Sequence, residues 1–512
     1  MAVAKFVQGS ILRHILVMSS TGAVGISALF IVDLLDVFYL SILGEQELAA
    51  AVGYAGAISY FTTSIGIGLS IALGALVSRS IGAKDTEKAK RLLLNSVVVT
   101  LLVSIVVSVS VCLFIPELLS IVGARGHTAE LAASYLYILV PSLPLICLAM
   151  ALGNALRAVG DAKLSMVSTL IGGGVNAVFD PILIFMFAMG IEGAAVASVM
   201  SRVAVFIVSA RGVVVKHQLF GRFNKAHFIA DLKPIFAIAG PAMLTSIATP
   251  IGNVVVTRAI SDFGDSYVAG WAVLGRVIPV SFGMIFALSG AIGPIVGQNF
   301  GAQQYDRVKE SLTRAIQFCC AYVVVVSLLM FLTRNQIVSV FDMKGDAAEL
   351  ILFFCTYIAI FFIFSGILYV ANASFNNLGK AKYSTLFNVG KATVGTIPFV
   401  YFGGQWWGAY GVLVGQVLGS IIFGVLGVIV AYRLVEKVKE QQAAQPNSST
   451  TSEAVIKVDK VTEFDEELTM SSQSPLSSSC TNMAMITEEQ DCEASNKVAE
   501  LIGFKGEKPP TK

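Results

Sequence analysis

Long apolar runs alternate with short polar or glycine-containing loops along most of this 512-residue chain. Cutting the sequence at charged and turn-forming residues leaves twelve such runs. They are 13–43, 48–78, 92–116, 130–152, 164–189, 193–215, 232–261, 267–297, 312–333, 349–373, 383–402 and 408–433. Each is long enough for an α-helix to cross a hydrocarbon core of about 30 Å. The pattern predicts an all-α polytopic membrane protein with twelve transmembrane helices.

Composition supports this fold class. The chain is 55% hydrophobic and only 13% charged, whereas a soluble protein carries about 25% charged residues. The sequence lacks a GxxxxGK[ST] phosphate-binding loop and a stretch long enough for a soluble nucleotide-binding domain. It also lacks an embedded nucleophile–histidine–acid set. We therefore expect neither an enzyme nor an ATP-driven pump, and an ion gradient remains as the energy source.

Charge alternates between the loops on the two sides of the predicted helices. One set holds Lys84, Lys88, Lys90, Arg91, Arg157, Lys163, Lys216, Arg222, Lys225, Lys233, Arg307, Lys309, Arg314, Lys380 and Lys382. The other set is mainly acidic, with Glu45, Glu47, Glu192, Asp262 and Asp265. The positive-inside rule places the basic set in the cytoplasm. It predicts a multi-pass protein of the cell membrane, plasma or bacterial inner, with both termini cytoplasmic.

An internal repeat with an offset of about 219 residues relates the two halves. "GALVSRSIGAKDTEKAK" at 74–90 aligns with "GPIVGQNFGAQQYDRVK" at 293–309, and "RAVGDAK" at 157–163 with "NNLGKAK" at 376–382. Six helices per copy make this a parallel repeat, which predicts two six-helix lobes suited to alternating access. The expected parts are an N-lobe (1–215), a cytoplasmic loop (216–232), a C-lobe (233–435) and a tail (436–512).

The tail differs from the rest of the chain. Its stretches "QQAAQPNSSTTSEAV" and "SSQSPLSSSC" are rich in Ser, Thr and Gln and have no sustained apolar period. This composition predicts a disordered cytoplasmic extension. It is either regulatory or dispensable.

The fifth run contains a polar group that is unusual for a membrane helix. Asn176 and Asp180 are four residues apart and share a helix face, and Pro181 deprives the Ala177 carbonyl of its helical donor. Three oxygens at a kink suit a hard cation such as Na+. The carboxylate can instead bind a proton, because burial disfavours its charged form. A third possibility is a kink whose backbone is satisfied by these side chains, without an ion.

Ionisable residues inside membrane helices are functional candidates by default. Asp36, in the middle of the first run, is a candidate second carboxylate of the same cation site, which would make Na+ binding at Asp36, Asn176 and Asp180 possible. Asp33, three residues earlier, is expected to have a supporting polar role.

Together these motifs resemble the multidrug and toxin extrusion (MATE) family of the MOP flippase superfamily. The resemblance covers residues 10–435. It lies in "VDLLDVFYLSILGEQELAA", "GIGLSIALGALVSRSIGAKDTEKA", "NALRAVGDAK", "NAVFDPILIF" and "GIEGAAVASVMSR". It implies twelve helices in two lobes that export organic, often cationic, compounds in exchange for H+ or Na+.

The family also implies site residues. Asp36, Asn176 and Asp180 match the family's N-lobe cation site, Ser198 matches its helix-six hydroxyl, and a carbonyl near Ala194 completes the shell. Asn154, in "NALRAVGDAK", is a further candidate. The second half departs from the branch of the family that carries acids in helices seven, eight and ten. It instead holds Lys391, which aligns with Gly172 and either tunes the cleft toward anionic or amphoteric substrates or extends to the cytoplasmic interface.

We therefore expect an ion-coupled exporter of small organic compounds. It would act as a monomer in the bilayer, with no cofactor beyond the coupling ion, no ATP and no nucleic acid. Two alternatives remain at this point: an exporter or flippase of another substrate, such as an organic acid or a lipid-linked saccharide, and a non-transporting membrane sensor or scaffold.

Overall fold

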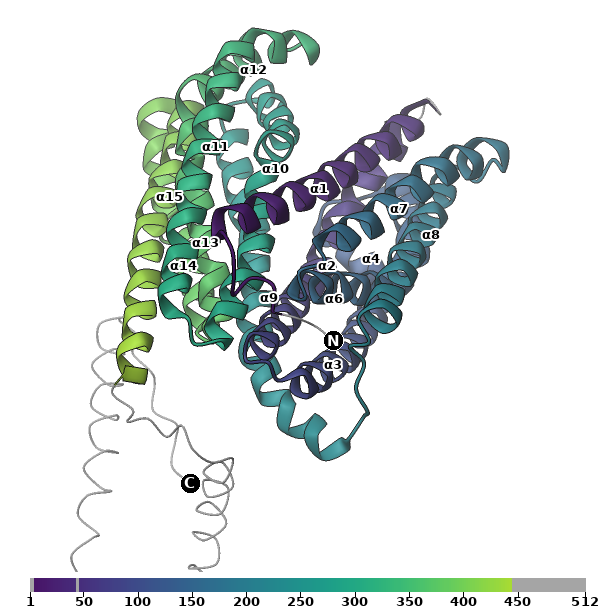
Figure 1. Ribbon diagram of the computed structural model, residues 1–512. Helices are drawn as coiled ribbons and strands as arrows, with labels where there is room; N and C mark the ends of the chain where they lie inside the picture. The colour runs from purple at the N-terminus through teal and green to yellow at the C-terminus, as the bar shows by residue number, and fades with distance from the viewer. Residues whose placement is uncertain (1–3, 43–45, 444–512) are drawn as a thin grey trace, which may run out of the picture. The chain divides into compact units, whose positions relative to one another are not determined.

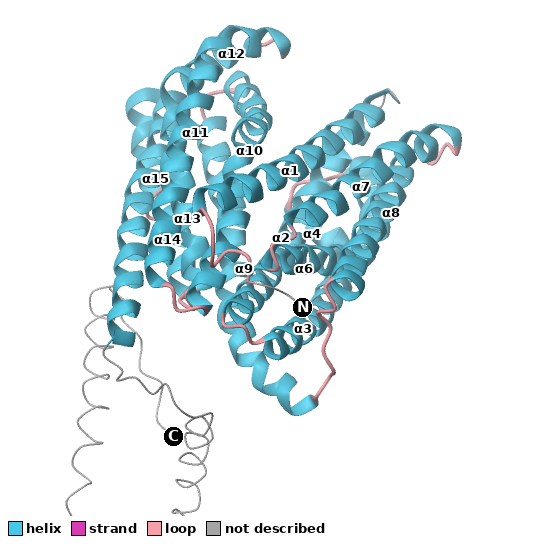
Figure 2. Cartoon of the chain, in the orientation of Figure 1, coloured by secondary structure: helices cyan, strands magenta, loops and turns pink. Residues whose placement is uncertain are grey.

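The computed structural model describes residues 4–42 and 46–443 (Figure 1). The predicted tail from residue 444 onward and the side chain of Asp33 lie outside the described part. Every regular element among the described residues is a helix (Figure 2). The all-α fold class is therefore confirmed.

The first half contains six membrane-crossing segments, of which several are broken into shorter helices. They are α1 (Ile11–Ile42), α2 (Gln46–Gly82), α3 (Thr86–Leu113) with the short α4 (Ile115–Ile121), α5 (Gly126–Leu139) with η1 (Val140–Ser142) and α6 (Leu143–Ala158), α7 (Ala162–Pro181) with η2 (Ile182–Met186), and α8 (Gly190–Arg211) with η3 (Gly212–Lys216). The fourth segment breaks at Pro141 and Pro144, because each proline lacks an amide hydrogen for the helical ladder.

The second half repeats this order. It consists of α9 (Lys225–Ser261), α10 (Asp265–Gly301), α11 (Tyr305–Val340), α12 (Gly345–Phe353) with η4 (Phe354–Ile358), η5 (Ala359–Phe361) and α13 (Phe362–Asn377), then α14 (Ala381–Ala392) and α15 (Ile397–Ala443). Non-helical backbone at Trp407 and Gly408 divides α15. The eleventh segment is therefore α14 with the first part of α15, and the twelfth is the rest of α15.

Two predicted boundaries differ from the structure. Residues 225–232, expected in the inter-lobe loop, form the first turns of α9, because Asn224 Oδ1 accepts hydrogen bonds from the amides of Ala226 (2.9 Å) and His227 (3.4 Å). The last helix runs to Ala443 rather than ending at 435. Ion pairs of Lys309 with Glu436 (2.7 Å) and of Lys439 with Asp306 (2.6 Å) attach this extension to α11.

Two long helices pass from one lobe to the other. Ile11 and Ile15 of α1 are buried in the core of the second half, while further along α1, Val32 lies against Gly173 of α7. In the same way, Ile235 of α9 packs in a cluster with Leu69 of α2, and the far end of α9 joins the second-half core. Movement of either helix is therefore transmitted to both lobes.

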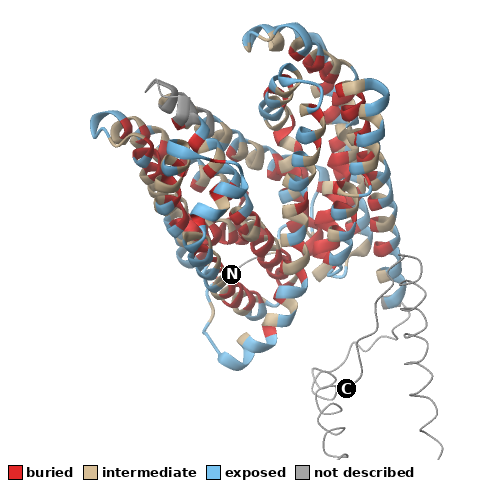
Figure 3. Cartoon of the chain, turned by 180° about the vertical axis from the view of Figure 1, so that it is seen from behind, coloured by how far each residue is buried: buried red, intermediate tan, exposed pale blue. Residues whose placement is uncertain are grey.

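The outward faces of the helices are apolar, as a lipid environment requires. On α3, for example, Leu102, Val106, Val109 and Leu113 are all exposed and lie at helical spacing. Figure 3 shows the buried residues inside each lobe and where the lobes meet, and the exposed residues along the outer faces. The chain is thus a multi-pass membrane protein.

At one end of the molecule the lobes meet through a close backbone crossing of α2 and α10. A Cβ added to Gly82 would overlap the carbonyl of Gln298, and one added to Gly301 would overlap the carbonyl of Arg79. Glycines four residues apart, here Gly297 and Gly301, allow such close helix contacts. Because position 82 is equivalent to 301 and position 79 to 298 in the repeat, the crossing is symmetric.

Side chains reinforce this crossing in the same symmetric way. Arg79 donates hydrogen bonds to the carbonyls of Asn376 and Asn377 at the end of α13 (both 2.6 Å). Its repeat equivalent, Gln298, donates through Nε2 to the carbonyl of Ala158 at the end of α6 (2.7 Å). Each lobe thus donates hydrogen bonds to carbonyl groups in the last turn of a helix in the other lobe, where helical donors run out.

The N-terminal segment lies over this crossing. The amide of Phe6 donates to Gln298 Oε1 (2.9 Å), and its carbonyl accepts hydrogen bonds from Asn299 (3.2 Å) and Arg307 (3.1 Å). Phe6 is itself buried. We refer to Gly82, Gly301, Arg79, Gln298 and this segment as the closed end.

Replacing Gly301 by Ala should destabilise the protein, because the new Cβ meets backbone atoms of α2 that cannot move without separating the lobes. Overpacking of this kind costs about 1–3 kcal/mol. Thermal unfolding of the purified protein in detergent measures the effect. The control is Gly290→Ala on the same helix, where nothing lies within 4 Å of an added Cβ. Equal melting temperatures for the two variants would contradict a tight crossing.

Candidate functional site

Helix α7 is held between two neighbours by its run of glycines. A Cβ at Gly172 would overlap Val205 of α8, and one at Gly173 would approach Val32 of α1 to 3.1 Å. Ser201 of α8 also donates a hydrogen bond to the Gly172 carbonyl (2.8 Å). The glycines therefore let α7 approach both helices closely, one turn before Asn176 and Asp180.

Pro181 ends the regular part of α7. A single π-helical turn, η2, follows it, and the amide of Ile182 donates to Phe179. The carbonyl of Ala177 thus lacks its usual helical donor, because Pro181 has no amide hydrogen. The predicted proline interruption is present directly beside Asp180.

Asp36 of α1 and Asp180 of α7 lie side by side within the first lobe. Their carboxyl groups are close enough to form a hydrogen bond when one of them carries a proton. When both are ionised, neither carboxylate can donate a hydrogen bond to the other. Accordingly, Asp36 Oδ1, Asn176 Oδ1 and both carboxylate oxygens of Asp180 are buried without a donor. Asn176 and Asp180 are 2% and 0% exposed, so water does not satisfy these oxygens from outside.

Ser198 of α8, the sixth membrane-crossing segment, lies near the aspartate pair, and so does a tyrosine that the sequence did not suggest. Ser198 of α8 lies close to the hydroxyl of Tyr135 of α5, and Tyr135 is near enough to both aspartates to interact with them electrostatically. Ala194 is buried in the same part of α8. Tyr135 was missed because it sits in an ordinary apolar run, "SYLYIL", where an aromatic residue predicts only core packing.

Asn154 belongs to a different network. Its Nδ2 donates to Ser70 of α2 (2.8 Å), and its Oδ1 accepts from Nη2 of Arg157 (2.7 Å). Arg157 in turn donates to Ser165 of α7 (3.1 Å). Asn154 thus ties α2, α6 and α7 together near the closed end, away from the aspartate pair.

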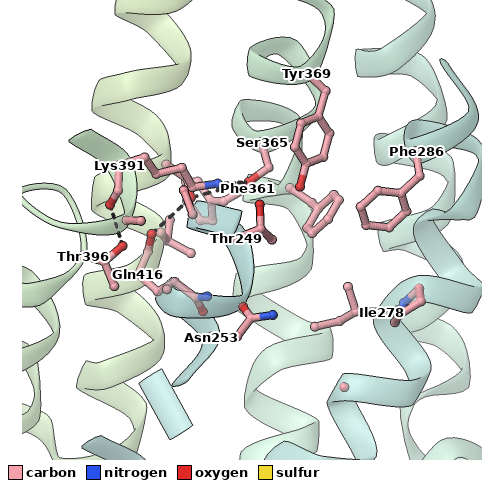
Figure 4. Close-up of a pocket in the computed structure, with 18 of the residues that line it drawn as sticks. Thr249, Asn253, Ile278, Phe286, Phe361, Ser365, Tyr369, Lys391, Thr396 and Gln416 are labelled. Atoms are coloured by element: carbon pink, nitrogen blue, oxygen red, sulfur yellow. Dashed lines mark hydrogen bonds between the residues drawn. The ribbon is translucent and has the colours of Figure 1, made fainter. Parts of the chain in front are cut away.

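The second lobe contains a cavity of about 490 Å³. Figure 4 shows its lining, in which Lys391 lies at one side, Phe286 at the other, and Ser365 and Tyr369 between them. Ile26 and Phe30 of α1 and Tyr60 of α2 also contribute to the cavity from the first half. Lys391, which the sequence left between two roles, lines this cavity and donates from Nζ to Ser365 Oγ (2.9 Å).

Two related helical lobes joined at one end, with buried carboxylates in one and a cavity lined mainly by the other, are an arrangement typical of membrane transporters. The chain belongs to the MatE family, whose model matches residues 23–182 and again 241–402. The second match begins 218 residues after the first and ends 220 after it. This agrees with the predicted repeat offset of about 219, and the family assignment made from the motifs is confirmed.

Relatives with assigned functions match most of the chain. It is 25% identical to a protein of Shewanella oneidensis named FAD transporter, over 84% of this chain and 96% of the relative. It is 24% identical to the multidrug export protein MepA of Staphylococcus aureus, over 80% of this chain and 90% of the relative. The fold matches a solved MOP superfamily transporter from Pyrococcus furiosus with a TM-score of 0.80 and 22% identity, covering 86% of this chain and 99% of that one.

The start of α7 depends on Asp161, which lies outside the membrane-spanning segments. Burial raises the pKa of this carboxyl, but hydrogen bonds from Lys216 (2.7 Å), His217 (2.9 Å) and the Leu164 amide more than offset it, and the pKa is lowered. A lowered pKa stabilises the fold above the unfolded value of about 3.9, and this stabilisation is lost as pH falls through the folded value.

Asp161→Asn should therefore be less stable than the wild type at pH 7, by at most about 1 kcal/mol because Lys216 is exposed. The difference should shrink as the pH falls below the unfolded value of about 3.9 and through the lower folded pKa of Asp161. Melting temperatures of both proteins across this range provide the measurement. A difference that stays constant with pH would show that the charge of Asp161 contributes nothing.

Proposed function

We propose that this MATE-family transporter exports small organic compounds by antiport, and that the aspartate pair of Asp36 and Asp180 binds the H+ or Na+ that drives it. The aspartate pair is the observation that carries the proposal. Two buried carboxylates at hydrogen-bonding distance repel each other when both are ionised, so a proton or a metal cation between them is strongly favoured. Such a site responds directly to an ion gradient.

The neighbouring oxygens support either ion. A proton would allow one carboxyl to donate to the other. A sodium ion would find oxygen ligands from Asp36, Asn176 and Asp180, all buried without donors. Ser198, near Tyr135, would add a hydroxyl oxygen to this set. No other cofactor is needed for either reaction.

The helices that hold the pair provide a route from ion binding to lobe movement. Asp36 lies on α1, and Ile11, Ile15 and Met18 at the start of this helix are buried in the core of the second lobe. Asp180 lies next to Pro181 and the π turn, where the backbone ladder of α7 is already interrupted. A cation that draws the two side chains together would therefore shift α1 against the second lobe. Coupling follows if cation and substrate favour different lobe arrangements.

We further propose that the closed end faces the cytoplasm. The loops after Gly82, Ala158, Gly301 and Asn377, at this end, are those whose basic residues the positive-inside rule assigns to the cytoplasm. The structure then corresponds to a state closed toward the cytoplasm, with both termini on that side of the cell membrane. The names of the two relatives, a FAD transporter and a multidrug exporter, support small organic substrates. We expect a monomer that uses no ATP.

Replacing Asp36 or Asp180 by Asn should abolish coupling, because an amide cannot take up a proton and weakens cation binding. In proteoliposomes, norfloxacin accumulation driven by an imposed H+ or Na+ gradient should fall by about tenfold or more. Norfloxacin exchange without a gradient should persist, because neither aspartate lines the second-lobe cavity and the substitutions leave that cavity unchanged. Testing each gradient alone identifies the ion.

Asp262→Asn is the matched control, because the Asp262 side chain is 64% exposed at a helix end. It should transport as the wild type does. Full gradient-driven accumulation in both Asp36→Asn and Asp180→Asn would contradict coupling at this pair.

A further inference from the structure

The cavity of the second lobe has a chemistry opposite to that of the aspartate pair. It is formed mainly by α9, α10, α13, α14 and α15. Lys391 is the one charged side chain among the described residues that line it. The first lobe therefore presents buried acids, whereas the second presents a base.

The ammonium of Lys391 has free donor capacity. It donates a hydrogen bond to Ser365 Oγ (2.9 Å), and the Ser365 hydroxyl donates in turn to Ser420 Oγ (3.4 Å). An ammonium has three donors, so two remain for the cavity. Within the described residues, no carboxylate lies within ion-pair distance of Nζ.

The local backbone fixes the position of this lysine. Lys391 is at the end of α14, where the helix stops at Ala392, and its carbonyl accepts a hydrogen bond from Thr396 (2.7 Å). The side chain thus extends from an anchored turn rather than from a mobile loop (Figure 4). It is directed into the cavity, where Nζ bonds Ser365.

An unpaired ammonium in a membrane protein interior is costly unless a counter-charge accompanies it. Where the protein supplies none, a ligand can supply it. The equivalent position in the first lobe is Gly172, which packs against α8. Helix packing in this repeat therefore does not require a lysine at this position.

The rest of the cavity suits a flat ring. Phe286 lies 5.7 Å from Tyr369 and 6.3 Å from Phe362, ring centre to ring centre, and Phe362 stacks on Phe282 (4.3 Å, 14°). Asn253 and Gln416 add amide groups near the lysine side of the cavity. Its volume of about 490 Å³ falls within the range of small-molecule sites, about 300–1,000 Å³.

We propose that this cavity binds aromatic organic anions, with a carboxylate or phosphate on Lys391 Nζ and the ring against Phe286 and Tyr369. This deepens, and rests on, the proposed transport function, and it differs from the organic cations that the family resemblance implied. Ion and substrate then occupy separate sites of opposite charge. Coupling between them must act through lobe movement rather than through competition for one carboxylate.

Binding of two flavins to the purified full-length protein in detergent tests the proposal. FMN and riboflavin share the same ring, but FMN alone has a phosphate. The wild type should bind FMN at least about tenfold more tightly than riboflavin. Lys391→Met should remove this preference by weakening FMN binding, with riboflavin affinity unchanged. Lys391→Arg, which keeps the charge, should retain most of the preference.

Lys382→Met is the matched control, because Lys382 is an exposed lysine on the same helix outside this cavity. It should leave the preference intact. The melting temperature of Lys391→Met shows whether the variant is folded, and unchanged riboflavin binding shows it independently. Equal affinity for FMN and riboflavin in the wild type, or an unchanged preference in Lys391→Met, overturns the proposal.

These outcomes are separate from those of the coupling experiment. If Lys391→Met leaves flavin binding unaltered while Asp180→Asn still abolishes gradient-driven transport, the anion site is wrong and ion coupling stands. If FMN binding depends on Lys391 but both aspartate variants transport normally, the substrate class stands and the coupling site is wrong.

Discussion

The backbone crossing of α2 and α10 at Gly82 and Gly301 is the contact on which the arrangement of the two lobes depends. At this point the main chains approach so closely that neither position accepts a side chain. Arg79 and Gln298 then reach across to satisfy helix-end carbonyls in the opposite lobe. Because equivalent positions of the two halves act in both directions, the duplicated sequence forms a symmetric interface. The lobes are held at this end, and the elements farther along them, including the aspartate pair and the cavity, take their positions from it.

Charge is distributed unequally over this symmetric framework. In the repeat, the position equivalent to Asp36 is Val255, and the position equivalent to Asp180 lies near Phe399. Lys391 is equivalent to Gly172. The duplicated halves thus share helices and packing but not chemistry. In the first lobe, buried oxygens lack donors. In the second, the half-buried ammonium of Lys391 has no acid within ion-pair distance among the described residues. Helix α1 connects the two, since one end packs in the second-lobe core and Asp36 lies farther along it.

Much of the candidate site was visible in the sequence because its elements are local. Asn176 and Asp180 share a face through helical spacing, and Pro181 must interrupt whatever helix contains it. The same argument could not find Tyr135, whose contact with Ser198 joins helices more than 60 residues apart in sequence. Nor could it place Asn154, which its motif suggested but which binds Ser70 and Arg157 instead. The observed helix boundaries at 225 and 443 differ from the predicted ones for a similar reason. Caps and ion pairs extend these helices beyond their apolar segments.

By itself, the sequence determined the helical membrane fold, the duplication and the family, because apolar length and an internal offset are properties of the chain read in order. It also identified the acids of the first lobe, since a carboxylate in an apolar run is unusual wherever the helix packs. Only the tertiary structure decided which groups meet. It placed Asp36 beside Asp180, and it put Lys391 into the lining of a cavity with aromatic side chains. A side chain's role inside a membrane depends on its neighbours from distant helices, and no local pattern records those neighbours.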